Sequence, residues 1–317
     1  MPVMRGSTMF ELPKRKHLVH KPVEFRNLCA EAKKRIQSVA NEDWIWETKY
    51  DGVHGILVVT EDESHLYSRE GNECISCPHI IADSRDLKPG VYFGEVWSMF
   101  MTFPEISGAF RRQYASAESE QLRYVAFDMV TLDEFQIGVS NDSFQVRRGN
   151  MWASVNAAQR DKLYPALHTA YSFTYSEEGL GSINAHISDM RRTTVYGTDG
   201  FIAKRAGGDW TAGAGAKGQQ IKVKDHISVD LRCVGLAEGV GKFAGMVGAL
   251  LVEFKGQIVP VGGGKLTDKE RLAYFTDPAY HIVGKIVEVH ALGFTPDGQL
   301  REPRFQRVRD DKLEPSE

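Results

Sequence analysis

The chain has 317 residues, of which 42% are hydrophobic and 26% charged, and its formal net charge is −3. These values are ordinary for a folded, water-soluble protein, and the length suffices for one large domain or two ordinary ones. No run of about 18 apolar residues occurs, and the start lacks the apolar core of a signal peptide. We therefore expect a cytoplasmic protein without a membrane contact.

In chain order, the pattern predicts a helix and then a series of strands. Residues 25–39 place apolar side chains on one helical face. The runs WIWETKY and GILVVT indicate strands on either side of an Asp-Gly turn, and HLYSREGN and VYFGEVW indicate two more. A helix is predicted over 104–121, and LRYVAFDMV is predicted to be a buried strand.

The predicted secondary structure changes in the second half of the chain. Residues 141–198 are predicted to be mostly helical and irregular, with a helix within 174–193, followed by the short strands GFIAKR and QQIKVKD. Beyond 226, about five β-rich runs and one helix, opened by a capping-box pattern at Thr267, suit an OB-fold barrel. We predict two domains, 1–226 and 227–317.

Four cysteines in this length do not indicate a disulfide scaffold. Cys74 and Cys77 form one C-x-x-C pair, but a zinc site needs four ligands, and Cys29 and Cys233 have no matching spacing. We predict two loop thiols, with metal or redox use as the alternative.

The stretch ETKYDGVHG contains K-x-D-G, which by itself occurs by chance in about one chain of this length in ten. Lys49 ends an apolar strand beside a tight turn, and a lysine nucleophile must first lose its proton. Lys204, Lys222 and Lys224 lie on predicted strands downstream. Such a cation cluster is expected to depress the pKa of Lys49 and to neutralise a phosphate.

Two carboxylates, Glu95 and Asp199, lie on or beside predicted strands. Carboxylate oxygens are the ligands that Mg²⁺ or Mn²⁺ requires for phosphoryl transfer. We predict them as metal ligands.

Taken together, the segments resemble the covalent nucleotidyltransferase superfamily, and most closely the small ATP-dependent DNA ligases of bacteriophages. The resemblance extends from about residue 41 to residue 312. It implies an α+β fold: an adenylation domain, ATP-grasp-like, of antiparallel sheets with helices, followed by an OB-fold barrel. The matching segments, in family order, are KYDG (49–52), SREG (68–71), FGEVW (93–97), FDMV (127–130), DGFIAK (199–204), IKVK (221–224) and RDDK (309–312).

The resemblance implies an ATP-dependent enzyme that seals 5′-phosphate/3′-hydroxyl nicks in duplex DNA, for replication, repair and recombination. Lys49 would carry AMP, which then passes to the 5′-phosphate before the 3′-hydroxyl displaces it. The resemblance places Glu47 and the backbone of Thr48 at the adenine edge, Phe127 on the adenine face, and Arg69 and Glu95 near the ribose. It places Glu95 and Asp199 at the metal and Lys222 and Lys224 at the α-phosphate. Lys204 would be among the nucleotide-binding cations, and Arg309 and Lys312 would contact the leaving pyrophosphate.

Some residues depart from the family pattern. His54 stands where the family has an arginine that engages the nick, so we expect His54 to share DNA contacts with Arg69. Asp199 replaces the usual glutamate of its motif, and Gln219-Gln220 replaces a frequent tryptophan. Despite the negative net charge, local basic patches can bind phosphates. We therefore expect further DNA contacts from Lys14, Arg15 and Lys16 in the basic segment 13–21.

Three alternatives remain from the sequence: an RNA ligase, an mRNA-capping guanylyltransferase, and a catalytically dead protein that binds nicked DNA. NAD-dependent ligases are disfavoured because the sequence lacks a four-cysteine zinc module. No base-reading motif is evident, so we expect binding through phosphates, without sequence preference, by a monomer.

Overall fold

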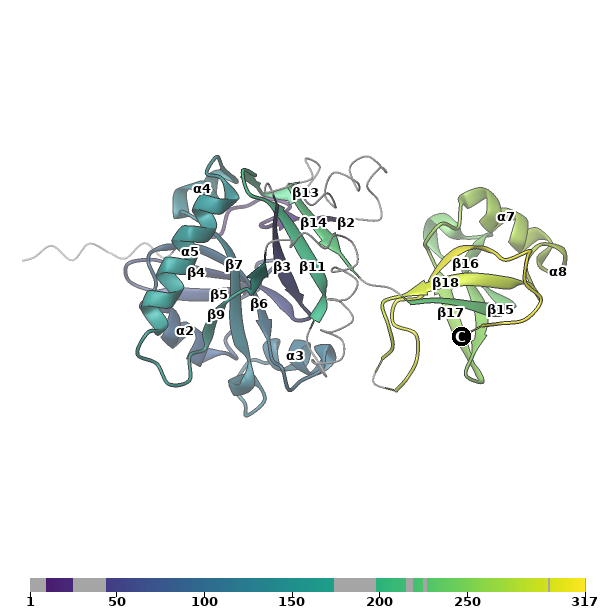
Figure 1. Cartoon of the computed structure of the whole chain (residues 1–317), viewed down its shortest axis with the longest axis horizontal. Helices are drawn as coiled ribbons and strands as arrows, with labels where there is room; N and C mark the ends of the chain where they lie inside the picture. Colours follow the sequence, from purple (N-terminus) through teal and green to yellow (C-terminus); the bar gives the residue numbers. More distant parts are fainter. Residues whose placement is uncertain are drawn as a thin grey trace, which may run out of the picture. The chain divides into compact units, whose positions relative to one another are not determined.

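The computed structural model describes residues 10–24, 44–173, 198–214, 219–224, 227–295 and 297–316. The helices predicted at 25–39 and 174–193, and the domain boundary predicted at 226, lie outside these residues. The chain divides into two compact units, of which one ends at Lys224 and the other begins at Asp225 (Figure 1). Among the described residues, no helix is long and apolar enough to cross a membrane.

Two five-stranded sheets form most of the first unit (Figure 1). One has the strand order β10 (Ser172–Phe173), β3 (Trp44–Tyr50), β11 (Thr198–Arg205), β14 (Gln220–Val223) and β2 (Val23–Glu24). The other has the order β5 (Ser64–Ser68), β4 (Val53–Val59), β6 (Gly90–Trp97), β7 (Arg123–Val130) and β9 (Leu167–Thr169). Two small sheets pair β1 (His20–Lys21) with β13 (Gly213–Ala214), and β12 (Trp210–Thr211) with β8 (Val139–Ser140).

The two large sheets are mainly antiparallel, as the resemblance implied, and each contains one parallel pair. Most neighbours run antiparallel, but β7 pairs with β9 and β14 pairs with β2 in parallel. Parallel neighbours need a long connection. Helix α5 (Phe144–Gln159) lies between β7 and β9 in the chain and provides such a connection.

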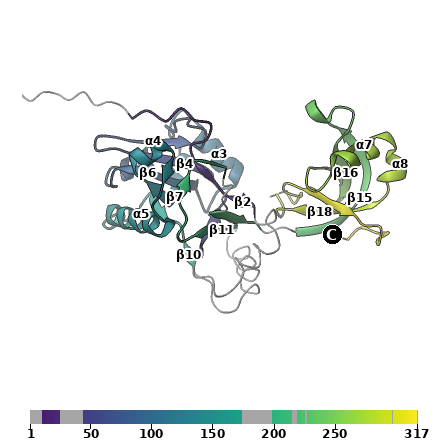
Figure 2. The same ribbon diagram turned by 90° about the horizontal axis from the view of Figure 1, so that it is seen from above.

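The second sheet is covered on both faces, and the apolar residues of strand β4 pack on both sides. This strand is apolar at every position from 56 to 59, which is typical of a strand with no solvent-facing side. Leu57 and Val59 pack into a core with helices α2 (Pro78–Ser84), α3 (Phe103–Phe110) and α5. Ile56 and Val58 point to the opposite face and pack with Trp210 and helix α4 (Leu132–Ile137). Figure 2 shows α5 beside β7.

The helix predicted over 104–121 is shorter in the structure. α3 ends at Phe110, and a 3-10 turn, η2, covers Ser119–Gln121. Between them, the Ser119 hydroxyl accepts a hydrogen bond from the Ser116 N–H at 2.8 Å, and the Ser116 hydroxyl accepts one from the Ser119 N–H at 3.2 Å. Serine side chains compete with helical hydrogen bonds in this way, so the chain turns here.

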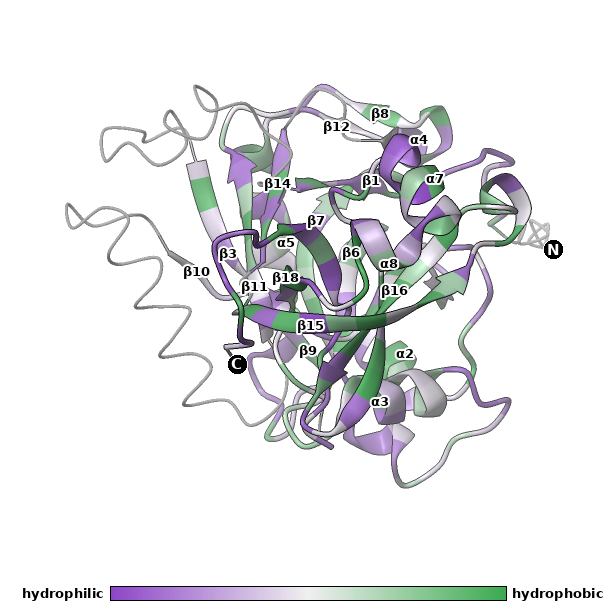
Figure 3. Cartoon of the chain, turned by 90° about the vertical axis from the view of Figure 1, so that its right-hand side faces the viewer, coloured by the Kyte–Doolittle hydropathy of each residue, from purple (hydrophilic) through white to green (hydrophobic). Residues whose placement is uncertain are grey.

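The second unit is a closed barrel, which confirms the predicted OB-fold. Its strand order is β15 (Ile227–Glu238), β16 (Val247–Phe254), β17 (Gln257–Gly262), β19 (Arg304–Val308) and β18 (Ile286–Ala291). Figure 3 shows polar and apolar residues following one another along β15, as expected for a strand with one side in the barrel core. Helix α7 (Asp268–Thr276) packs on β16, and the short α8 (Pro278–His281) follows it. The predicted capping box is present, because the Thr267 hydroxyl accepts from the Glu270 N–H at 3.2 Å.

Candidate active site

Three motif segments that are distant in the sequence lie on adjacent strands of the first sheet. β3 carries Glu47, Thr48 and Lys49. β11 runs antiparallel to β3 and places Phe201 opposite Thr48, and β14 in turn places Val223 opposite Phe201. Backbone pairing therefore brings KYDG, DGFIAK and IKVK together.

Lys49 is tied to a carboxylate. Its Nζ lies 3.0 Å from Asp199 Oδ2, and Lys224 Nζ lies 2.7 Å from the same oxygen. Burial lowers the pKa of Lys49, but the negative charges of Asp199 and Glu95 outweigh burial and raise the pKa above its ordinary value. The prediction that neighbouring lysines depress this pKa is therefore wrong in this structure. Lys49 is protonated at neutral pH and must lose a proton before it can act as a nucleophile.

The predicted lysine pair on β14 divides between two carboxylates. Lys224 contacts Asp199, whereas Lys222 Nζ lies 3.3 Å from Glu24 Oε1 on the neighbouring β2. Burial raises the pKa of Asp199, but the charges of Lys49 and Lys224 outweigh it and hold the pKa below its ordinary value. Asp199 is therefore ionised at neutral pH and able to bind cations.

Glu95 lies on β6 directly opposite His54 of β4. Burial raises the pKa of Glu95 to about 7, although the charge of Lys49 and a hydrogen bond from the Gly52 backbone act against it. A nearby cation would favour its ionised form. Glu95 and Asp199 both act electrostatically on Lys49, so the two predicted metal ligands belong to one site.

Two motif glycines are required by close backbone contacts at this site. A Cβ on Gly52 would lie 2.3 Å from the Val96 carbonyl oxygen, a distance that no real contact allows. Gly200 has a φ of +98°, and its Cβ would lie 2.1 Å from the Val223 carbonyl oxygen. The glycines of KYDG and DGFIAK therefore let neighbouring strands approach each other around Lys49 and Asp199.

His54 lies against the aromatic residue that was predicted to stack on adenine. Its ring centroid is 5.4 Å from that of Phe127, in an edge-on arrangement, and 6.5 Å from that of Phe93. Burial, followed by the charges of Arg69, Lys204 and Lys49, lowers the pKa of His54 to about 3. The imidazole is therefore neutral, and its Nε2 is buried without a hydrogen-bond partner among the described residues. The predicted contact of His54 with DNA stays a prediction.

Beneath Phe127 lies a buried ion pair. Lys204 Nζ lies 2.7 Å from Glu47 Oε2, and both side chains are 2% exposed. Lys204 also donates to the Phe127 carbonyl oxygen at 2.6 Å, and its ammonium lies 4.6 Å from the Phe127 ring centroid. Lys204 is therefore a buried lysine with a carboxylate partner, and its predicted contact with the nucleotide stays a prediction. Glu47 and Lys204 support the position of Phe127. The backbone of Thr48 was predicted to lie at the adenine edge, and its N–H donates to the Tyr171 carbonyl oxygen at 3.0 Å in this structure.

A second buried pair holds the next residue of the FDMV motif. Arg147 Nε lies 2.9 Å from Asp128 Oδ1 and Nη2 lies 3.0 Å from Oδ2, a two-pronged contact between nearly unexposed side chains. Arg147 was not among the site residues predicted from the sequence. Arg147 is a charged residue on the side of α5 that packs against β7. A charged residue in such a buried position needs a partner of opposite charge, and this would have indicated the pair.

Replacing Arg147 with alanine is expected to lower the free energy of unfolding by about 3–5 kcal/mol, because Asp128 would remain buried without a counter-charge. All five tryptophans of the sequence precede residue 225, so tryptophan fluorescence during urea titration reports on this unit. Arg112→Ala is the control, since it breaks the exposed pair with Glu118 at 2.7 Å and should cost less than about 1 kcal/mol. Equal effects of the two changes would contradict the prediction.

Of the predicted DNA contacts in this unit, only some side chains are exposed. Arg69 is 57% exposed and pairs with Glu70 at 3.0 Å. Lys14 and Lys16 are exposed. Arg15, in contrast, donates to the carbonyl oxygens of His17 and Gln136, each at 3.1 Å, and lies over the Phe135 ring. Arg15 therefore attaches the segment around it to α4. The sequence had predicted a DNA contact for Arg15 but not this structural role.

Two family models match the sequence. One, described as the ATP dependent DNA ligase domain, matches residues 26–224, which is more than half of the chain. The chain belongs to the ATP-dependent DNA ligase family. The second model, described as the DNA ligase OB-like domain, matches residues 238–309 of the ligase. Both models describe DNA ligases, which supports this activity over the RNA-ligase and capping-enzyme alternatives. The ligase uses ATP and forms phosphodiester bonds in DNA.

Solved structures share the fold of the ligase at low sequence identity. A Lig E DNA ligase, studied for DNA binding with a minimal scaffold, is 22% identical with a TM-score of 0.67, over 92% of this chain and 98% of that chain. Pmar-Lig_Pre. is 22% identical with a TM-score of 0.73, over 92% and 67%. The ATP-dependent ligase of bacteriophage T7, in complex with ATP, is 18% identical with a TM-score of 0.53, over 92% and 98%. No match was found among curated proteins.

In the barrel of the ligase, the two residues predicted to bind pyrophosphate lie together. Arg309 and Lys312 both contact Asp230, which is 6% exposed. Asp230 was not among the predicted site residues, although an aspartate inside the apolar run ISVDLRCVGL indicates a buried counter-ion.

The C-x-x-C pair of the ligase lies between β5 and α2. Cys74 and Cys77 are buried, and their sulfurs lie 3.4 Å and 3.5 Å from the Ser76 hydroxyl. Within the part of the chain that the structure describes, no group of three or more His, Cys, Asp or Glu side chains could hold a metal. Cys74 and Cys77 lie in a loop, as predicted, but both thiols are buried.

Proposed function

We propose that the ligase seals nicks in duplex DNA through an AMP adduct on Lys49. The deprotonated amine attacks the α-phosphorus of ATP, a P–N bond forms, and pyrophosphate leaves. The 5′-phosphate of the nick then takes AMP from Lys49, and the 3′-hydroxyl displaces AMP to close the strand. The observation that supports this proposal is that Lys49 and Lys224 share one oxygen of Asp199, at the meeting point of three motif strands.

The contacts of the site suggest how the residues would divide the work. A phosphate can replace Asp199 and Glu24 as the partner of Lys224 and Lys222, because it offers several anionic oxygens. Phe127 is half-buried, so part of its ring is accessible for stacking on adenine. Glu47 and Lys204 would hold Phe127 from below.

Two carboxylates beside Lys49 fit a divalent cation. Asp199 is ionised, and Glu95 has a pKa near 7 that a cation would lower. Mg²⁺ commonly uses one or two protein carboxylates and takes its other ligands from water and phosphate. We propose that Glu95 and Asp199 hold Mg²⁺ or Mn²⁺, which would neutralise phosphate charge.

The proposal is tested by incubation with ATP or GTP labelled at the α-phosphate, followed by denaturing electrophoresis. Label from ATP but not from GTP is expected on the protein. Its absence, from protein first freed of bound AMP, would support the catalytically dead alternative. Sealing of nicked DNA and of nicked RNA by the same preparation then compares the substrates, and we expect nicked DNA to be preferred.

We propose that the DNA is bound as a nicked duplex, without sequence preference, by a monomer. Replacing both Lys14 and Lys16 with alanine is expected to reduce the slope of log binding constant against log salt by about 2, since each phosphate contact contributes about 0.9. Fluorescence anisotropy on nicked DNA measures the slope. Arg85→Ala with Lys88→Ala removes two exposed charges elsewhere and should leave the slope unchanged. An unaltered slope in the Lys14/Lys16 variant would remove this segment from the interface.

His54→Arg is expected to preserve self-adenylation and to leave nick sealing unchanged or improved, because the family arginine at this position engages the nick. The two reactions are measured separately, as labelled protein and as sealed strand. Because His54 lies against Phe127, loss of self-adenylation is the informative opposite result. That result would assign His54 to the nucleotide and not to the nick.

A further inference from the structure

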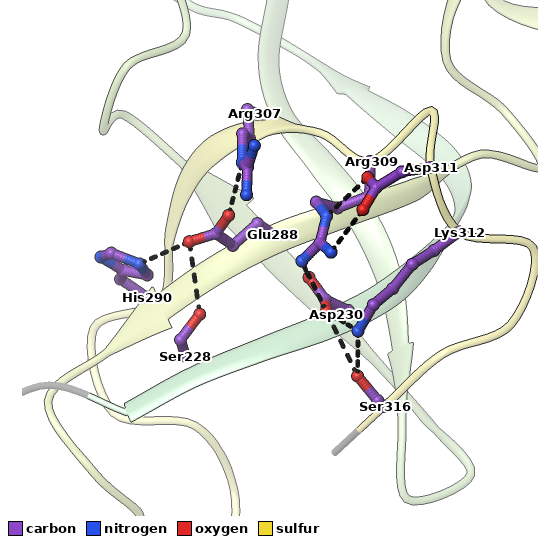
Figure 4. Close-up of polar contacts among 9 residues, drawn as sticks. All are labelled: Ser228, Asp230, Glu288, His290, Arg307, Arg309, Asp311, Lys312 and Ser316. Atoms are coloured by element: carbon purple, nitrogen blue, oxygen red, sulfur yellow. Dashed lines mark hydrogen bonds and ion pairs between the residues drawn. The ribbon is translucent and has the colours of Figure 1, made fainter.

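A carboxylate on barrel strand β15 contacts both cations that the family resemblance places at the leaving pyrophosphate (Figure 4). Arg309 Nη1 donates to both oxygens of Asp230, at 3.0 Å to Oδ1 and 2.9 Å to Oδ2. Lys312 Nζ lies 2.5 Å from Oδ2. A guanidinium and an ammonium therefore meet at one oxygen atom.

The C-terminal residues complete this arrangement. Ser316 donates its hydroxyl to Asp230 Oδ2 at 3.2 Å and accepts a hydrogen bond from Lys312 Nζ at 2.8 Å (Figure 4). The backbones of Ser316 and Asp230 pair in both directions, at 2.8 Å and 2.9 Å. Ser316 is thereby held on β15, and the Lys312 ammonium has two partners, Asp230 and Ser316.

The outer edge of Arg309 is occupied by an exposed carboxylate. Its Nε and Nη2 pair with Asp311 at 2.8 Å and 2.7 Å, and the Asp311 side chain is 64% exposed. Asp230, in contrast, is nearly buried. The guanidinium therefore has a buried inner contact and an exposed outer contact, and a phosphate would approach Arg309 by taking the place of Asp311.

A neighbouring carboxylate shows that this arrangement is particular to Asp230. Glu288 of β18 lies directly opposite Asp230 in the barrel. It has its own partners, Arg307 at 2.7 Å, His290 at 2.9 Å and the Ser228 hydroxyl at 3.4 Å (Figure 4). Neither Arg309 nor Lys312 contacts Glu288 in any described interaction, so Glu288 offers a matched control on the same barrel.

We infer that Asp230 is a positioning residue for the ATP-consuming step. Two cations at one point repel each other, and the charge of Asp230 offsets that repulsion. Arg309 and Lys312 are thereby held side by side, ready to meet neighbouring oxygens of one polyphosphate chain. The inference rests on the proposed function and on the family resemblance, which implies that these two cations contact the leaving pyrophosphate.

Asp230→Asn keeps the shape of the side chain and removes its charge. Self-adenylation is expected to fall at least tenfold, mainly through a higher KM for ATP, and removal of AMP from the adenylated ligase by pyrophosphate should slow in parallel. Sealing of a nick that already carries AMP on its 5′-phosphate should stay within twofold of wild type, because that step involves no polyphosphate. An equal loss in both reactions, or no change in KM, would overturn the inference.

Control variants separate the possible failures. Glu288→Gln should leave both reactions within twofold of wild type. If Arg309→Ala and Lys312→Ala keep full self-adenylation, the proposed role of these cations fails, and the inference with it. If they lose self-adenylation while Asp230→Asn does not, the inference alone fails. Should Asp230→Asn not fold, Ser316→Ala is the milder variant: a two- to fivefold higher KM for ATP is expected, and an unchanged KM would overturn the inference.

Discussion

Replacing Lys49 with alanine is expected to abolish self-adenylation, a loss of at least about 10⁴-fold, because the variant lacks the amine on which we propose that the P–N bond to AMP forms. Labelled ATP and denaturing electrophoresis measure the loss. Sealing of a nick that already carries AMP should persist, since that reaction needs no nucleophilic lysine. Retained label on the Lys49→Ala protein would refute the assignment of Lys49.

Lys49→Arg is the matched variant for this test. An arginine keeps the positive charge that faces Asp199, but its guanidinium does not lose a proton in proteins and cannot act as the nucleophile. It should therefore fold like the wild type, by thermal unfolding, and be as inactive in self-adenylation as the alanine variant. Activity in the arginine variant would mean that Lys49 contributes charge and not an electron pair.

Replacing Asp199 with asparagine is expected to slow self-adenylation by about 10²–10³-fold. The change removes the oxygen shared by Lys49 and Lys224 and one of the two carboxylates that we propose for the metal. Asp199→Glu should retain much of the activity, because the family motif begins with glutamate at this position. The measurement is the rate of label transfer at several Mg²⁺ concentrations, where the asparagine variant should need more metal.

The control for Asp199 is Glu24→Gln. Glu24 pairs with Lys222 as Asp199 pairs with Lys224, but it has no predicted part in metal binding. We expect less than about a threefold effect on self-adenylation, comparable to the loss of one partly exposed pair. If the two variants are equally impaired, Asp199 acts only by holding lysines in place.

Much of the site could be predicted because its parts are local motifs. The strand WIWETKY and the following Asp-Gly turn are decided by short-range pattern, and the structure has β3 at those residues. The capping box at Thr267 is similarly local, because one side chain bonds the backbone three residues later. The helix expected over 104–121 failed for a related reason: serine side chains took over the backbone hydrogen bonds that would have extended it.

The charges at the site could not be predicted in the same way. The sequence places Lys49, Lys222 and Lys224 within reach of one another, which suggested a lowered pKa for Lys49. The outcome depends on which charge lies nearest, and that is Asp199, at 3.0 Å and 150 residues away in the chain. Electrostatic energy varies with distance and burial, which sequence order does not specify.

By itself, the sequence determined the family, the two-part architecture and the set of residues that bear the chemistry, because these follow from short motifs in a fixed order. Only the tertiary structure decided how those residues pair. It buried Lys204 with Glu47, placed His54 against Phe127, and joined Arg309 and Lys312 through Asp230. The contacts between these side chains depend on strand register and burial. The neighbouring strand, which can be distant in the sequence, provides the partner of each side chain.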